Sequence, residues 1–165
     1  MFRIKAEYSE QFELKTNLER ARQFFGELRN VVDLMPGIEN IRSEANGIKR
    51  WMVRTDVPML GSMRAAFAVE LTDDSPHRLE YSPAVGETSN FLRYVAAFEE
   101  RGAKTLVRIV QRVEMRRSSA RDLHMLAGLL GEGRLSAEMQ KRVAEMIKTF
   151  LQRARAKLEG QALCN

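Results

Sequence analysis

The feature that most constrains the fold of this chain is a long amphipathic segment near its C-terminus, residues 136–160. Apolar side chains recur in it at steps of three and four, which places them on one face of an α-helix. The opposite face carries polar and charged side chains, namely Lys141, Arg142, Glu145, Lys148, Gln152, Arg153, Arg155 and Lys157. The apolar members are Met139, Val143, Met146, Ile147, Phe150, Leu151, Ala154 and Leu158. A helix with such a stripe needs an apolar surface to pack on, and the preceding residues must supply it.

The preceding residues contain seven segments in which apolar and polar side chains alternate, as in strands with one apolar face. Turn sequences such as Asn46-Gly47 and Asp73-Asp74-Ser75-Pro76 separate some of them. The segments are residues 2–15, 38–45, 48–57, 63–71, 78–83, 92–99 and 105–116. We therefore expect one long antiparallel sheet that runs as a meander around one apolar face.

Helical patterns fill two of the intervals between these segments. Thr16 with Glu19 and Asn30 with Asp33 are expected to cap two short helices, which Pro36-Gly37 ends. Ser119 with Asp122 is expected to open a leucine-rich helical segment that Gly131-Glu132-Gly133 stops. Ser136 would then cap the long final helix.

Composition limits the class of protein. The chain has 165 residues, of which 44% are hydrophobic and 30% charged, so we expect one soluble globular domain over residues 1–165. No apolar run approaches the ~18 residues that crossing a bilayer requires. The chain starts directly with a strand pattern, so we expect no signal peptide and a cytoplasmic protein. The net charge of +5 is spread along the chain, which argues against nucleic acid as a partner.

No sequence pattern indicates a metal or cofactor site. The single cysteine, Cys164, excludes an internal disulfide framework and any cysteine-based zinc cluster. His77 and His124 stand apart from each other and from Cys164, so neither metal binding nor Cys-His catalysis is expected. Arg50 and Arg54 share one strand face, where they either bind an anion or are solvated.

The order of the elements resembles the helix-grip superfamily, also called SRPBCC. This superfamily includes START lipid-transfer domains, polyketide cyclases and birch-pollen-allergen-like proteins. The sequence is most similar in character to its bacterial branch, which contains a family of carbon monoxide dehydrogenase subunits and polyketide cyclases. The residues that carry the resemblance are LMPGIENI at 34–41, the hairpin at Asn46-Gly47, VPMLGSMRAAF at 57–67 and LAGLLGEGRL at 126–135. The resemblance covers nearly the whole chain.

The resemblance implies an α+β helix-grip fold, in which a curved seven-stranded antiparallel sheet, with two short helices after its first strand, wraps around the C-terminal helix. It also implies a cavity between sheet and helix that accepts apolar ligands. Side chains of equal parity on successive strands should then face this cavity, together with the apolar face of the helix. The expected ligand-binding residues are Trp51, Val53, Phe67, Tyr81, Tyr94, Ile109, Gln111, Met146 and Phe150.

Polar members of this inward set have two interpretations. Tyr81, Tyr94, Gln111 and Thr55 either contact a ligand or satisfy buried groups in a filled core. Glu10 also falls on the apolar parity of its strand. We expect a β-bulge near residues 9–11 to return its carboxylate to solvent, because burying an unpaired charge is costly. Otherwise Glu10 would be a buried general acid or base.

The segment 119–135 also has two interpretations. We expect a static connector whose leucines pack on the sheet edge, while the alternative is a mobile lid or a surface that contacts a membrane or a protein partner. The nine methionines and Trp51 fit ordinary core packing or an adaptable binding site.

Three functions follow as hypotheses. The first is non-enzymatic binding or carriage of a hydrophobic small molecule such as a lipid, a quinone or a polyketide-like compound. The second is a cyclase, aromatase or hydrolase that uses Glu10, Tyr81, Tyr94 and Gln111 as acid-base or orienting groups. The third is an accessory protein that docks a larger complex. The sequence does not indicate the ligand or the oligomeric state.

Overall fold

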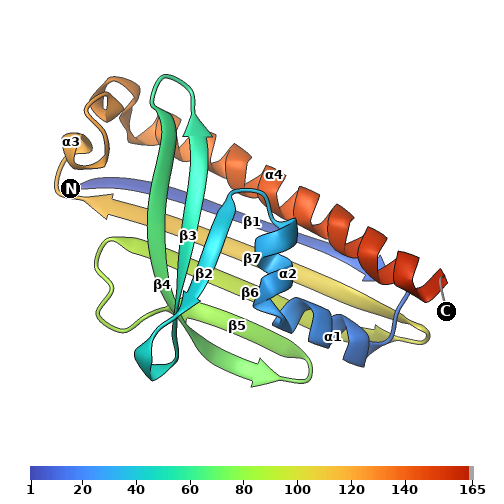
Figure 1. Cartoon of the computed structure of the whole chain (residues 1–165). Helices are drawn as coiled ribbons and strands as arrows, with labels where there is room; N and C mark the ends of the chain where they lie inside the picture. Colours follow the sequence, from blue (N-terminus) through green and yellow to red (C-terminus); the bar gives the residue numbers. More distant parts are fainter. Residues whose placement is uncertain (164–165) are drawn as a thin grey trace.

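The computed structural model describes residues 1–163, so Cys164 lies outside the described residues. One antiparallel sheet and one long helix dominate it (Figure 1). The elements in chain order are β1 (Phe2–Leu14), α1 (Leu18–Gly26), α2 (Leu28–Leu34), β2 (Ile38–Ser43), the 3-10 turn η1 (Ala45–Gly47), β3 (Ile48–Val57), β4 (Gly61–Ser75), β5 (Arg78–Pro83), β6 (Asn90–Arg101), β7 (Lys104–Arg117), α3 (Ala120–Leu123) and α4 (Ala127–Leu163).

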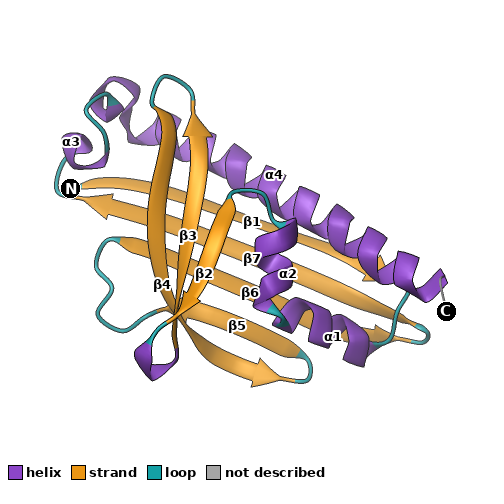
Figure 2. Cartoon of the chain, in the orientation of Figure 1, coloured by secondary structure: helices purple, strands orange, loops and turns teal. Residues whose placement is uncertain are grey.

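The seven strands form a single sheet in the order β1-β7-β6-β5-β4-β3-β2. Strands β2 to β7 are a meander, and β1 pairs with the last of them, so β1 and β2 are the two edges. In Figures 1 and 2, β2, β3 and β4 cross the direction of β1, β6 and β7, and the sheet curves around α4. The predicted α+β helix-grip fold is therefore confirmed, including the two short helices after the first strand.

The apolar stripe of α4 packs on the concave face of the sheet. Ile147, Phe150 and Ala154 are completely buried, and the Phe150 ring meets the Phe25 ring edge-on with 5.7 Å between their centroids. Phe25 in turn lies 5.8 Å from Phe98 of β6. Burial of one such large apolar side chain contributes about 1.5–3 kcal/mol, so this stripe holds helix and sheet together.

The flank of α4 is hydrogen-bonded to the open edge of β1. The Glu132 carboxylate accepts the backbone N–H of Arg3 at 2.7 Å, and the Ser136 hydroxyl accepts that of Lys5 at 3.1 Å. Gln140 accepts the N–H of Glu7 at 2.9 Å and donates to its carbonyl at 2.6 Å. Residues four apart on a helix and two apart on a strand advance by similar distances, about 6 to 7 Å, so the two rows stay in step.

Helix α4 starts earlier than the sequence predicted. Its residues run from Ala127, with a break at Gly131, where φ is +78°. The helix resumes immediately after this glycine, so Ser136 lies inside the helix and does not cap it. The hydroxyl of Ser136 is engaged by β1 instead, which a pattern within one segment could not indicate.

Two predicted helix caps were also wrong. The side chain of Asn17, and not that of Thr16, accepts the N–H of Arg20 at the start of α1. Glu27 caps α2 in place of Asn30, whose amide donates to the carbonyl of Phe24. The predicted box at residues 119 and 122 is present, because Asp122 accepts the N–H of Ser119 at 3.1 Å.

The predicted β-bulge near Glu10 is absent. Strand β1 pairs with β7 without a register shift from Phe2 to Leu14, and Glu10 lies opposite Ile109. Glu10 stays half-buried on the apolar parity and accepts the Tyr8 hydroxyl at 3.2 Å. Because β1 is an edge strand, a side chain of this face reaches solvent beside the helix, and no bulge is required.

No helix within residues 1–163 is long and apolar enough to span a membrane.

We predict that Gln140→Ala lowers the free energy of unfolding by about 1–3 kcal/mol, because it removes two hydrogen bonds to the β1 backbone. Chemical denaturation with a circular dichroism readout measures the loss. Lys141→Ala is the matched control, since that side chain is exposed and forms only a surface ion pair with Glu138. Equal stability of both variants would show that the contact between α4 and the β1 edge is energetically unimportant.

Candidate functional site

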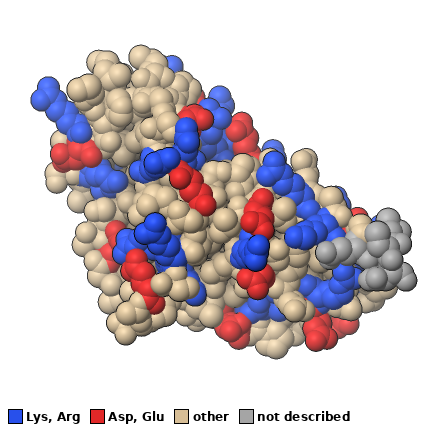
Figure 3. Space-filling model, viewed as in Figure 1, with Lys and Arg blue, Asp and Glu red and all other residues tan. Residues whose placement is uncertain are grey.

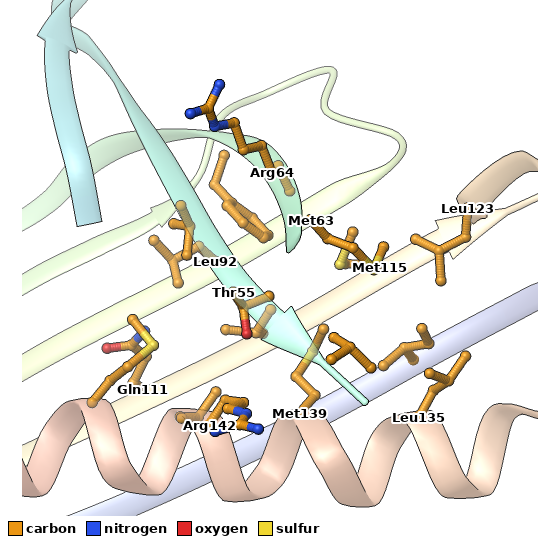
Figure 4. A pocket seen from close by; sticks show the side chains of 18 residues that line it. Thr55, Met63, Arg64, Leu92, Gln111, Met115, Leu123, Leu135, Met139 and Arg142 are labelled. Carbon is orange, nitrogen blue, oxygen red and sulfur yellow. The ribbon is translucent and has the colours of Figure 1, made fainter. Parts of the chain in front are cut away.

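An apolar cavity lies between the sheet and the first turns of the continuous part of α4 (Figure 4). It is bounded by β3, β4 and β7, by the start of β1 and by Leu123 of α3. The centre of a water molecule has access to about 70 Å³ of it, and the empty space, including the part open to solvent, is about 760 Å³. One water-sized group needs roughly 10–15 Å³ by the first measure, so the inner space has room for a few such groups.

Methionines form much of the cavity wall. Met63 of β4, Met115 of β7, and Met139 and Met146 of α4 all line it. The methionine side chain is unbranched and polarisable, so it adapts to ligands of irregular shape. Typical small-molecule pockets occupy several hundred Å³. A ligand of that size would extend into the open part of the cavity and displace these side chains.

Four of the nine expected ligand-binding residues line this cavity. They are Val53, Phe67, Gln111 and Met146. The other five do not line it and lie in the buried core beyond it. These five are Trp51, Tyr81, Tyr94, Ile109 and Phe150. Strand parity thus predicted the face of the sheet, but one half of that face is filled by aromatic side chains. A ligand contact by any of the nine stays a prediction.

An aromatic cluster fills the core next to the cavity. The Trp51 ring lies 5.7 Å from that of Tyr94 and 6.4 Å from that of Tyr81. Tyr94 is completely buried, and this burial raises its pKa. Burial also raises the pKa of Tyr81, with a further contribution from the charge of Asp74. Both phenols are therefore neutral at physiological pH. Neither could act as a base there.

Three polar side chains line the cavity with a buried atom that has no hydrogen-bond partner within the described residues. These atoms are the Thr55 hydroxyl oxygen, Gln111 Oε1 and Arg142 Nε. They come from β3, β7 and α4, and Figure 4 shows Thr55, Gln111 and Arg142 among the side chains that line the cavity. Gln111 is only 2% exposed. This polar group can orient a ligand that the apolar wall alone would bind in many ways.

Arg142 was missed by the sequence analysis, which assigned it to the charged face of the helix. The residue directly precedes Val143 and follows Met139 by three positions, so it borders the apolar stripe. Long basic side chains at such a border can lay their stem along apolar surface. This position at the border of the stripe was the one sign in the sequence that Arg142 could face inward. The hydrophobic pattern alone cannot show that a cavity lies beside it.

Some side chains of the segment 119–135 pack inward, as in a connector, and others are exposed, as in a contact surface. Leu123 lines the cavity and Leu130 packs on the core, as expected for a connector. Met125 and Leu129 are instead 79% and 75% exposed, and Met59 in the β3–β4 turn is exposed as well. Segments on both sides of the cavity therefore carry exposed apolar side chains. Movement of this segment as a lid stays a prediction.

Charged side chains are mixed on the face shown in Figure 3, where basic and acidic groups alternate. Arg50, for example, forms an ion pair with Glu44, and its hydrogen bond lowers the pKa of that carboxyl. In the part of the chain that the structure describes, no three His, Cys, Asp or Glu side chains are arranged to hold a metal ion. His77 is exposed, and His124 accepts the N–H of Leu126.

We predict that Phe150→Ala lowers the free energy of unfolding by about 3–5 kcal/mol, because the cavity it leaves is walled by Phe25 and other rigid core groups. Tyr94→Phe should leave that free energy unchanged or raise it, because its hydroxyl has no partner within residues 1–163. Urea unfolding of both variants measures these effects. A loss above about 1 kcal/mol for Tyr94→Phe would reveal a hydrogen bond that the described structure lacks.

Comparison of sequences finds no matching family model and no matching curated protein. Solved structures do match. A START superfamily protein from Mycobacterium smegmatis has a TM-score of 0.64 at 12% identity, and the match covers 94% of this chain and 98% of that one. The Zhui aromatase/cyclase from Streptomyces sp. R1128 has a TM-score of 0.61 at 14% identity, covering 93% and 95%.

A larger protein contains the same unit. The di-domain aromatase/cyclase StfQ from the steffimycin biosynthetic pathway matches with a TM-score of 0.62 at 11% identity. The match covers 96% of this chain and 52% of StfQ, so this chain spans about half of that protein. Identities this low establish shared architecture and leave activity open. The resemblance to the branch with the carbon monoxide dehydrogenase subunits stays a prediction. The chain has the helix-grip fold of START-like, or SRPBCC, proteins.

Proposed function

We propose that this protein binds or carries a hydrophobic small molecule in the cavity between the sheet and α4. The observation that carries the proposal is the cavity itself, whose wall is almost entirely apolar and includes four methionines. Removing apolar ligand surface from water is favourable at about 25 cal/mol per Å². A lipid, a quinone or a polyketide-like compound would fit this chemistry.

The proposal assigns different roles to the nine residues expected from the sequence. Val53, Phe67, Gln111 and Met146 contact the ligand, because they line the cavity. The remaining five support this wall from the core. They are Trp51, Tyr81, Tyr94, Ile109 and Phe150. Met59 and Met125 are exposed on segments whose neighbouring residues, Met63 and Leu123, line the cavity.

A cyclase or aromatase is the second candidate function. The observation that favours it is the Arg142 guanidinium group at the cavity wall, which could stabilise a developing enolate oxygen. Of the four residues proposed for acid-base chemistry, only Gln111 lines the cavity, while Glu10 is bound by Tyr8 outside it. The cavity wall, as far as the structure describes it, therefore offers no general base of this set. Binding without turnover is the better-supported function.

Docking to a larger complex, the cytoplasmic location and the lack of nucleic-acid partners stay predictions. No described feature singles out a protein partner.

The proposal predicts that the protein purified from cells retains an apolar molecule, which native mass spectrometry and organic extraction identify. The variant Ala65→Phe should lose at least about tenfold in affinity for that molecule, or for the dye 1-anilinonaphthalene-8-sulfonate, because its ring fills the cavity. Titration followed by fluorescence measures this affinity.

Ala66→Phe is the matched control, because the adjacent residue of β4 points to the opposite face of the sheet. Circular dichroism confirms that both variants are folded. If the wild-type protein carries nothing and binds no apolar probe, the binding function is wrong. Equal losses in both variants would show that the effect does not come from the cavity.

A further inference from the structure

We propose that the ligand carries a neutral hydroxyl group, which Gln111, Thr55 and Arg142 bind inside the cavity. The inference rests on the proposed function and specifies its ligand class. An apolar body would lie along the methionines, and the hydroxyl would lie at the boundary between the cavity and the aromatic core. The protein would then select phenols or alcohols over hydrocarbons of the same shape.

Gln111 supplies the hydrogen-bond acceptor of this site. The residue is fixed in β7 between β1 and β6, opposite Tyr8 on one side and Tyr94 on the other. It lines the cavity, is 2% exposed, and its Oε1 has no hydrogen-bond partner within residues 1–163. Leaving an amide oxygen buried without a donor is costly. A ligand that supplies a donor to this oxygen recovers that cost on binding.

Thr55 and Arg142 supply the complementary groups. The Thr55 hydroxyl can donate or accept, and Arg142 Nε–H can only donate. Both atoms are buried at the same cavity and have no partner among the described residues. In Figure 4, the Thr55 side chain projects from β3 toward α4, the helix that carries Arg142. One acceptor and two donors thus come from three separate elements that border the same cavity.

A hydroxyl group matches this set because it can donate and accept at the same time. It donates its proton to Gln111 Oε1 and accepts from Thr55 or Arg142 through its oxygen. A carbonyl or carboxylate oxygen accepts only, so it leaves Gln111 Oε1 unsatisfied. The charge of Arg142 is already paired, because its Nη1 donates to Glu145 at 3.3 Å. A neutral ligand therefore fits the site without a further counter-ion.

The experiment compares 2-naphthol with naphthalene by isothermal titration calorimetry, using the ratio of their Kd values. The wild-type protein should bind 2-naphthol about tenfold more tightly, as two ordinary hydrogen bonds allow. Gln111→Leu and, independently, Thr55→Val should each lower this ratio while naphthalene binding persists, because each variant removes one of the hydrogen-bond partners. Thr72→Val is the control, because Thr72 is exposed on β4 and bonds Ser82 and Glu80 outside the cavity.

A second readout keeps the test meaningful if one variant folds poorly. Without ligand, Gln111→Leu should have a Tm about 2–4 °C above that of the wild-type protein, because it removes an unsatisfied buried amide. A gain of roughly 1 kcal/mol in the free energy of unfolding shifts the Tm of a chain this size by that amount. A falling Tm would mean that Gln111 is bonded within the protein and would overturn the inference. Tighter binding of 2-naphthoate than of 2-naphthol would overturn it in favour of an anionic ligand.

The failures of the two proposals are distinguishable. If naphthalene and 2-naphthol both bind with equal affinity, and the variants change nothing, the cavity binds apolar molecules but the hydroxyl inference is wrong. If neither compound binds to the wild-type protein, and Ala65→Phe makes no difference to any apolar probe, the proposed function itself is wrong.

Discussion

The packing of α4 on the sheet is the interaction on which the rest of the structure depends. The helix uses two surfaces for it. Its apolar stripe packs into the concave face through groups such as Phe150, while its flank bonds the backbone of β1 through Gln140. The first contact is strong but tolerates sliding, whereas the second sets which helix residue lies beside which strand residue. Position along the helix is thereby fixed, and with it the side chains that face the cavity.

The division between packed core and cavity follows from this placement. Toward the C-terminal half of α4, the rings of Phe25, Phe98 and Phe150 meet and exclude a ligand. Toward its other half, the space is lined by flexible side chains such as Met139 and Met146. Rigid aromatic groups thus close one end of the sheet, and adaptable thioethers leave the other end able to open. The binding hypothesis depends on this contrast more than on the total apolar area.

The sequence predicted the elements well because periods of 2 and 3.6 report which face of an element is buried. It predicted the cavity less well, because parity places Trp51 and Val53 on one face without saying that only Val53 reaches the opening. Side chains that join distant segments were missed for a similar reason. Ser136 looked like a cap because its partner, Lys5, lies 131 residues away in the sequence. Arg142 looked like a solvated charge because nothing local reveals the neighbouring cavity.

The polar atoms of the cavity wall connect stability with function. A protein selected only for stability would replace Gln111 with an apolar residue, since its amide oxygen is buried without a partner in the described structure. Retaining the amide is costly to the free protein, and under the proposed function a ligand that donates to it recovers this cost. A buried polar group discriminates between ligands more strongly than apolar shape complementarity does, because a ligand that lacks the donor leaves this group unsatisfied. The fold thus supplies the cavity, and a few polar atoms at its boundary determine which molecules bind in it most tightly.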